Sequence, residues 1–109
     1  MPLNKQEETA LKQFKADLQQ VLGNQLIELN LYGTKARGED HPDSDVDVLV
    51  IVAGQDWRIC DTVYDIATDI LLQTNVCISP KVISESKFGQ LREEGAAFIR
   101  NIDKDVIVV

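Results

Sequence analysis

The chain reads Leu-Tyr-Gly-Thr-Lys-Ala-Arg-Gly at residues 31–38 and, after a short polar turn, Ser-Asp-Val-Asp-Val-Leu-Val at residues 44–50. Asp45 and Asp47 stand one residue apart where the second apolar run begins, so their side chains project from the same face of a strand. Mg²⁺ prefers oxygen ligands and is usually held by one or two carboxylates together with substrate phosphates. This stretch therefore predicts a site for a metal-bound nucleotide.

The turn after the first strand offers groups that suit phosphate oxygens. Gly33 lets the backbone approach a ligand closely because it has no Cβ, and Thr34 adds a hydroxyl. Lys35 or Arg37 would stabilise the negative charge of a leaving pyrophosphate, and Ser44 stands directly before the carboxylates. We expect these five residues to bind the nucleotide.

The spacing of these residues resembles the signature of the polymerase-β-type nucleotidyltransferases, which is Gly-Ser, about ten residues, then Asp-x-Asp. Here Gly33-Thr34 is followed by ten residues and then by Asp45-Val46-Asp47, so that threonine stands for the usual serine. The wider sequence, Tyr-Gly-Thr-Lys-Ala-Arg-Gly at residues 32–38, is similar to the minimal nucleotidyltransferases, or MNT proteins. Many of those are antitoxin partners of HEPN-domain ribonuclease toxins.

The resemblance implies an α+β fold of the polymerase-β-type nucleotidyltransferase class, with a small mixed sheet and helices packed on one face. It implies that Asp45 and Asp47 are both the metal ligands and the catalytic residues. The implied reaction transfers AMP from ATP, with Mg²⁺, to a hydroxyl, expected to be a tyrosine, of a HEPN-domain toxin. The toxin would be neutralised, and the two proteins would form a hetero-oligomer.

The third strand departs from the family pattern. Members that resemble this chain usually bring a third carboxylate from that strand, but no acidic residue lies between Thr74 and Ser84. By alternation, Ser79 or Cys77 occupies the expected place, and neither is a strong Mg²⁺ ligand. An alternative is therefore a non-catalytic antitoxin that inhibits its toxin by binding alone.

A chance match to the motif is a further alternative. An isolated Asp-x-Asp pair could belong to a solvated loop that enters a buried strand. The glycine turn and the ten-residue spacing argue against that interpretation here. Asp61, Asp65 and Asp69 also recur every four residues on a predicted helix, and we interpret them as a solvated face rather than as metal ligands.

Hydrophobic periodicity predicts the order of the elements. A helix should begin after Asn4 and stop at Gly23-Asn24, and a second helix should follow Ile59 to Ile70. The remaining expected elements are strands over residues 26–32, 46–52 and 76–84, a loosely packed helix over about 87–101 that buries Leu91, Phe98 and Ile102, and a short closing strand over 106–109. Pro80 should lie at a sheet edge or a bulge.

Length and charge limit the function. The 109 residues fit one minimal nucleotidyltransferase domain, residues 1–109, without a second domain for a small-molecule substrate. A net charge of −7, from 18 acidic and 11 basic residues, disfavours direct binding of nucleic acid. No apolar stretch is long enough to span a membrane, and the two cysteines lack the spacing of a zinc site, so we expect a cytoplasmic protein.

Overall fold

The computed structural model describes residues 3–32, 45–54, 56–97, 99–100 and 107–109. The elements follow in the order α1 (Lys5–Leu22), the 3₁₀ turn η1 (Gly23–Gln25), β1 (Leu26–Tyr32), β2 (Val46–Val52), α3 (Trp57–Thr74), β3 (Ile78–Ser84), α4 (Glu85–Glu93) and β4 (Ile107–Val108). The two predicted strands that flank the motif are confirmed with the same bounds. None of the described helices is long and apolar enough to cross a membrane.

The first helix begins and ends where its sequence predicts. The Asn4 side chain accepts a hydrogen bond of 2.8 Å from the backbone N–H of Glu7, and the backbone N–H of Asn4 donates one of 3.0 Å to the Glu7 carboxylate. This capping box satisfies two N–H groups that the first turn would otherwise leave without partners. At the other end Gly23 has a φ of +54°, which a residue with a Cβ rarely adopts.

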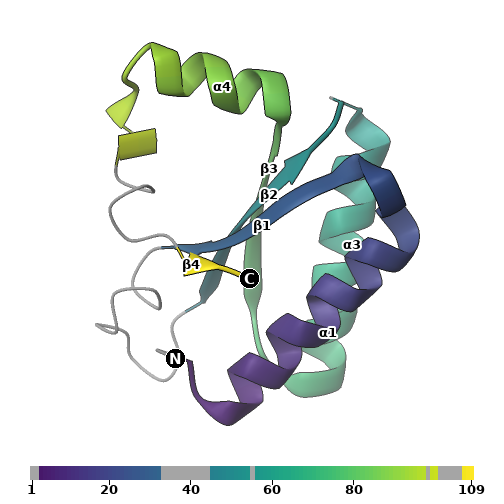
Figure 1. Ribbon diagram of the computed structural model, residues 1–109. Coiled ribbons are helices and arrows are strands. Elements are labelled where there is room, and N and C mark those ends of the chain that lie inside the picture. The colour runs from purple at the N-terminus through teal and green to yellow at the C-terminus, as the bar shows by residue number, and fades with distance from the viewer. Residues whose placement is uncertain (1–2, 33–44, 55, 98, 101–106) are drawn as a thin grey trace.

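The four described strands form one mixed sheet in the order β3-β2-β1-β4 (Figure 1). Strand β2 runs antiparallel to β1 and parallel to β3, and α3 makes the crossover between the two parallel strands. The short β4 pairs antiparallel with Asn30 and Leu31 of β1. The mixed sheet expected from the family resemblance is confirmed.

Helices α1 and α3 cover one face of the sheet. Val46, Val48, Val50 and Val52, the alternate residues of β2, all belong to the apolar core on this side. Phe14 of α1 is fully buried in the same core. The pleat of β2 therefore turns its other set of side chains, which includes Asp47, away from this core.

The fourth helix differs from the sequence expectation in place and in length. Figure 1 shows α4 on the other side of the sheet from α1 and α3, where Phe88 and Leu91 pack on a smaller apolar cluster of Leu49, Ile51 and Ile83. The prediction that the helices share one face is thus too narrow, although the fold class itself is confirmed.

The bounds of this last helix were also predicted wrongly. Helix α4 starts at Glu85 because Ser84 caps it, accepting a hydrogen bond of 3.2 Å from the N–H of Lys87. It ends in a Schellman motif, since Gly95 has a φ of +65° and the N–H of Ala96 bonds the Leu91 carbonyl at 3.1 Å. The side chains of Phe98 and Ile102 lie outside the described part of the chain.

We predict that Phe14→Ala lowers the free energy of unfolding by about 3–5 kcal/mol, because it opens a cavity in the larger core. Phe88→Ala is the matched control, since this ring is only half-buried on the smaller cluster and should cost less. Urea unfolding followed by circular dichroism measures both losses. Equal losses would contradict the division of the core into a larger and a smaller cluster.

Candidate functional site

The two aspartates of the motif lie at the start of β2. Asp45 is exposed directly before the strand, and Asp47 is partly buried as its second residue. The backbone N–H of Val46 donates a hydrogen bond of 2.9 Å to the carbonyl of Cys77, which ties this end of β2 to the start of the β3 segment. Both carboxylates therefore stand at one corner of the sheet.

Strand pairing brings the third strand beside these carboxylates. Asp47 pairs with Ser79 of β3, and Val46 pairs with Ile78. Paired residues point to the same face of a sheet, so Ser79 stands beside Asp47. Cys77 lies two residues before Ser79, close enough to Asp45 for that carboxylate to raise the pKa of the thiol.

The proximity of Asp45 changes the pKa of the Cys77 thiol. The pKa of the Cys77 thiol is raised from its ordinary value, first by partial burial of the thiol and then by the hydrogen bond to Asp45 and the charge of that carboxylate. Each of these effects favours the neutral thiol over the thiolate. Without a bound cation, Cys77 is therefore a protonated neighbour of the carboxylates rather than a thiolate ligand.

Three further residues on the same face of the sheet were not predicted as site residues. Tyr32 of β1 pairs with Asp47, and the pKa of its phenol is raised by burial first, then by the charge of Asp47 and by Tyr64. Lys81 follows Ser79 on the same face of β3. Asn30 is almost fully buried, and its Oδ1 has no hydrogen-bond partner among the described residues.

The signal that could have placed these residues is strand pairing. Antiparallel pairing of residues 26–32 with residues 46–52 puts Tyr32 opposite Asp47 once a register is chosen. Alternation alone then assigns Asn30 to the same face. The sequence contains the alternation but does not state the register between the two strands.

The donor set fits Mg²⁺ better than it fits a softer metal. Asp45 and Asp47 supply carboxylate oxygens, and Ser79 adds a hydroxyl in the place where a third carboxylate was expected. Within the described ranges no group of three histidine, cysteine, aspartate or glutamate side chains could hold a metal ion. Two carboxylates are enough for a Mg²⁺ ion whose other ligands are waters and substrate phosphates.

The predicted nucleotide-binding residues Gly33, Thr34, Lys35, Arg37 and Ser44 lie outside the described residues. Their neighbours in the sequence, Tyr32 and Asp45, are described, and Tyr32 pairs with Asp47. The described end of β1 and the described start of β2 thus lie side by side at the corner where the carboxylates stand.

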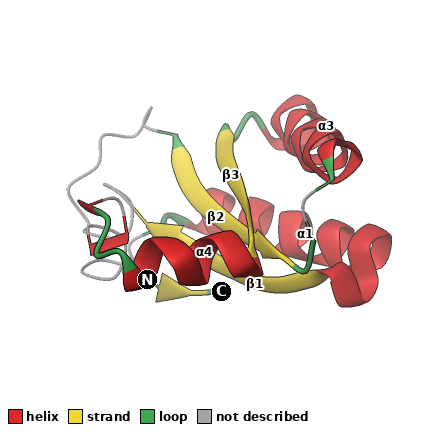
Figure 2. Ribbon diagram, turned by 90° about the horizontal axis from the view of Figure 1, so that it is seen from above, coloured by secondary structure: helices red, strands yellow, loops and turns green. Residues whose placement is uncertain are grey.

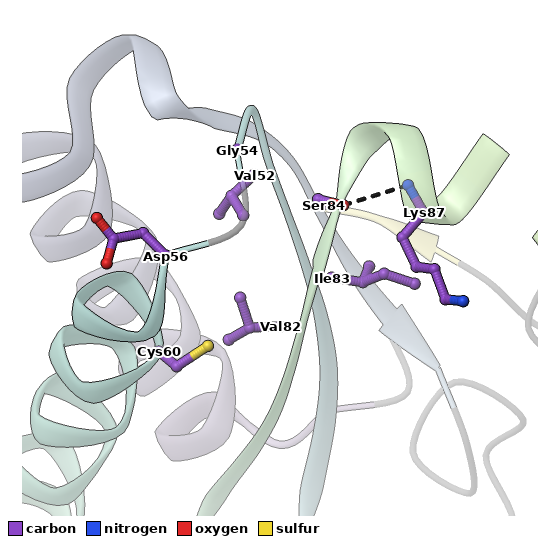
Figure 3. A pocket seen from close by; sticks show the side chains of 8 residues that line it. All are labelled: Val52, Gly54, Asp56, Cys60, Val82, Ile83, Ser84 and Lys87. Atoms are coloured by element: carbon purple, nitrogen blue, oxygen red, sulfur yellow. Dashed lines mark hydrogen bonds between the residues drawn. The ribbon is translucent and has the colours of Figure 1, made fainter. Parts of the chain in front are cut away.

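A hollow of about 140 Å³ lies at the other ends of β2 and β3, away from the carboxylates (Figure 3). Its lining residues are Val52, Gly54, Asp56, Cys60, Val82, Ile83, Ser84 and Lys87. Its oxygen-bearing side chains are already used by the helices. Asp56 accepts a hydrogen bond from the N–H of Arg58 at 2.9 Å, and Ser84 caps α4. This hollow therefore offers a ligand fewer available groups than the corner with the carboxylates.

Residues 11–107 match the family described as nucleotidyltransferase domain. The match spans most of the chain and includes both aspartates and the strand pairing around them. The chain belongs to the nucleotidyltransferase domain family. The chemistry inferred from the carboxylate pair and the family membership agree.

Two archaeal relatives of this nucleotidyltransferase have the same general description. Protein MJ0604 of Methanocaldococcus jannaschii, provisionally named a protein adenylyltransferase, is 34% identical over 96 residues, which cover 88% of this chain and 90% of the relative. Protein MJ0141 of the same organism, also provisionally named a protein adenylyltransferase, is 31% identical over 77 residues, or 70% of this chain and 78% of the relative.

Solved structures support the fold of the nucleotidyltransferase domain. A toxin–antitoxin structure with AMP-PNP has a TM-score of 0.55 at 16% identity and covers 87% of this chain and 68% of that chain. A mutant of the toxin–antitoxin pair MntA–HpeT has a TM-score of 0.56 at 18% identity, covering 98% of this chain and 72% of that chain. These likenesses concern the arrangement of the elements.

We predict that Asp45→Asn accelerates alkylation of Cys77 by iodoacetamide at pH 8 severalfold in protein kept metal-free with EDTA. The substitution removes the carboxylate charge that raises the pKa of the thiol, so more of the reactive thiolate is present at this pH. A Cys60→Ser background isolates Cys77, and mass spectrometry measures the rate. Asp65→Asn on α3 is the control, and an unchanged rate in Asp45→Asn would contradict the contact.

Proposed function

We propose that this nucleotidyltransferase transfers AMP from ATP, with Mg²⁺, to a hydroxyl of a protein, and that the acceptor is a tyrosine of a HEPN-domain toxin that is thereby neutralised. The observation that carries the proposal is the placement of Asp45 and Asp47 at one corner of the sheet, beside Ser79. The two relatives named as protein adenylyltransferases and the fold shared with a toxin–antitoxin structure support it.

Different residues of the chain would bind the cation, bind the phosphates and stabilise the leaving group. Asp45 and Asp47 would hold the cation, and Gly33 and Thr34 would bind phosphate oxygens. When bound, Mg²⁺ would supply Lewis-acid polarisation of the phosphate and offset negative charge on the leaving group. Either Lys35 or Arg37 adds positive charge near the pyrophosphate.

The transfer itself is an in-line displacement. The acceptor oxygen forms a bond to the α-phosphorus of ATP, while the bond from that phosphorus to the bridging oxygen breaks and pyrophosphate leaves. The hydroxyl proton is released to water, since the third strand offers Ser79 and Cys77 rather than a carboxylate base. Positioning and electrostatics supply most of the catalysis in such a step.

A second candidate function is a non-catalytic antitoxin that inhibits its toxin by binding alone. The register of β3 favours it, because a serine rather than a carboxylate stands beside Asp47. A serine hydroxyl brings no charge to offset the dehydration of Mg²⁺, so the ion is held less firmly. The two candidates differ in whether the carboxylate pair is needed to neutralise the toxin.

We predict that Asp47→Asn lowers the rate of AMP transfer at least about 100-fold, because loss of a metal ligand removes several kcal/mol of transition-state stabilisation. Intact mass spectrometry of the protein encoded by the adjacent gene, after incubation with ATP and Mg²⁺, counts the adenylyl groups added. The control is Glu93→Gln, which removes an exposed carboxylate from α4. Transfer that persists in a folded Asp47→Asn protein would exclude the proposed metal role.

We predict that Ser79→Asp lowers the Mg²⁺ concentration needed for half-maximal transfer severalfold, because it places a third carboxylate beside Asp47. Ser86→Asp, on the exposed start of α4, adds the same charge away from the site and should leave that concentration unchanged. Titration of Mg²⁺ at fixed ATP measures the shift. Transfer by Ser79→Asp when the parent shows none would instead establish the binding-only antitoxin.

A further inference from the structure

The outer face of α3 carries large apolar side chains that the fold does not use. Trp57, Tyr64 and Leu71 follow one another at intervals of seven residues and are 69%, 51% and 38% exposed. Leu72 beside them is 78% exposed. Residues seven apart share one side of a helix, so the first three form a stripe roughly 21 Å long at the rise of an α-helix. We call these four residues the α3 stripe.

The α3 stripe is continuous with the carboxylate corner. Figure 2 shows α3 along the β3 side of the sheet. A hollow of about 140 Å³ lies between helix and strand, and its lining includes Tyr64, Leu71, Pro80 and Cys77. The carbonyl of Cys77 in turn accepts the 2.9 Å hydrogen bond from the backbone N–H of Val46, the residue between Asp45 and Asp47. Asp47 projects from the opposite face of the sheet, so a molecule seated on the stripe and in this hollow would reach the proposed metal site around the β3 edge.

An acidic row borders the stripe. Asp61, Asp65 and Asp69 are all exposed and lie at four-residue spacing on the same helix. Like charges at this spacing repel one another, and this repulsion is unfavourable for the folded helix. A partner that offers apolar side chains with lysine or arginine beside them would bury the stripe and relieve this repulsion. Charge complementarity thus specifies the chemistry of the occupant.

The neighbouring sheet edge is unsuited to strand addition. Strand β3 is the outer strand of the described sheet, and Pro80 stands in its middle. Proline has no N–H, so an added strand would lose a ladder hydrogen bond at that position. The occupant is therefore recognised through its side chains, as an amphipathic helix would be.

We propose that the α3 stripe, its acidic row and the Tyr64–Pro80 hollow form the surface that docks the protein acceptor of AMP. The docked part is an amphipathic segment with apolar side chains flanked by basic ones. This inference rests on the proposed function, because it assigns the surface to the acceptor of that same site. The surface would hold the acceptor so that its hydroxyl reaches the phosphate bound at Asp45 and Asp47.

The test measures binding and transfer separately with the protein encoded by the adjacent gene as the probe. Biolayer interferometry with full-length Asp47→Asn protein, ATP being absent, gives the Kd of the complex without turnover. Tyr64→Ala combined with Leu71→Ala should raise that Kd at least about tenfold, as expected for truncation of interface anchors. Val21→Ala is the matched control, since this side chain is 59% exposed on α1, and it should leave the Kd within about twofold of the reference.

Charge reversal tests the acidic row. Asp61→Lys combined with Asp65→Lys should weaken binding and flatten its dependence on salt, because attraction between opposite charges is screened by salt. Glu93→Lys on α4 changes an exposed charge elsewhere and should leave both unchanged. In the transfer assay, the α3 variants should raise the KM for the acceptor while kcat is retained.

The outcomes separate the two proposals. Unchanged binding in the α3 variants, or no binding by the Asp47→Asn reference, would overturn the docking surface even if AMP transfer occurs. Binding that depends on these residues without any transfer by the parent would support the surface and overturn the proposed enzyme activity. Self-association that depends on Tyr64, seen by sedimentation, would show that a second copy occupies the surface and would also overturn the docking proposal.

Discussion

The register of β2 between its two neighbours is the constraint on which the structure depends. Its alternate valines are buried under α1 and α3, and a shift by one residue would carry Asp47 into that core and turn the valines to the opposite face of the sheet. Burying an unpaired carboxylate costs far more than any single strand contact supplies. The apolar core thus decides where the carboxylates stand, and the bond from Val46 to the Cys77 carbonyl fixes which residues of the third strand meet them.

Neutral neighbours change the electrostatics of the corner. A third carboxylate would strengthen the hold on a cation but would add repulsion whenever the cation is absent. With Ser79 beside Asp47, and a protonated Cys77 beside Asp45, the metal-free site carries less negative charge and is easier to keep folded. Such a site suits a cation that arrives already bound to a triphosphate, because the phosphate oxygens supply the missing negative charge. A donor set of two carboxylates and one hydroxyl is consistent with phosphate oxygens that supply the rest of the negative charge around the cation.

Much of the fold could be predicted from the sequence because local signals agreed with the packing. The cap at Asn4, the stop at Gly23 and the valine alternation each have a physical cause that acts within a few residues, and each was confirmed. The side of the sheet that α4 covers depends on the partners of its apolar residues, which no local pattern records. Gly95 indicated that the helix ends early, but the apolar spacing of the residues beyond Gly95 favoured a longer helix. Of the candidate site, alternation predicted that Ser79 or Cys77 would face the carboxylates, whereas Tyr32 required the register between strands.

Helix α4 packs separately from α1 and α3, so the parts of the described structure are held together by unequal amounts of apolar contact. Among the described residues, its Phe88 and Leu91 pack on the small cluster of Leu49, Ile51 and Ile83, whereas α1 and α3 share the larger core. Detaching α4 would therefore expose few apolar groups and leave β1, β2 and β3 covered by α1 and α3. We expect the backbone amides of α4 to exchange through an opening that costs less than global unfolding, and those of the strand that carries Asp47 to exchange only when the whole domain unfolds.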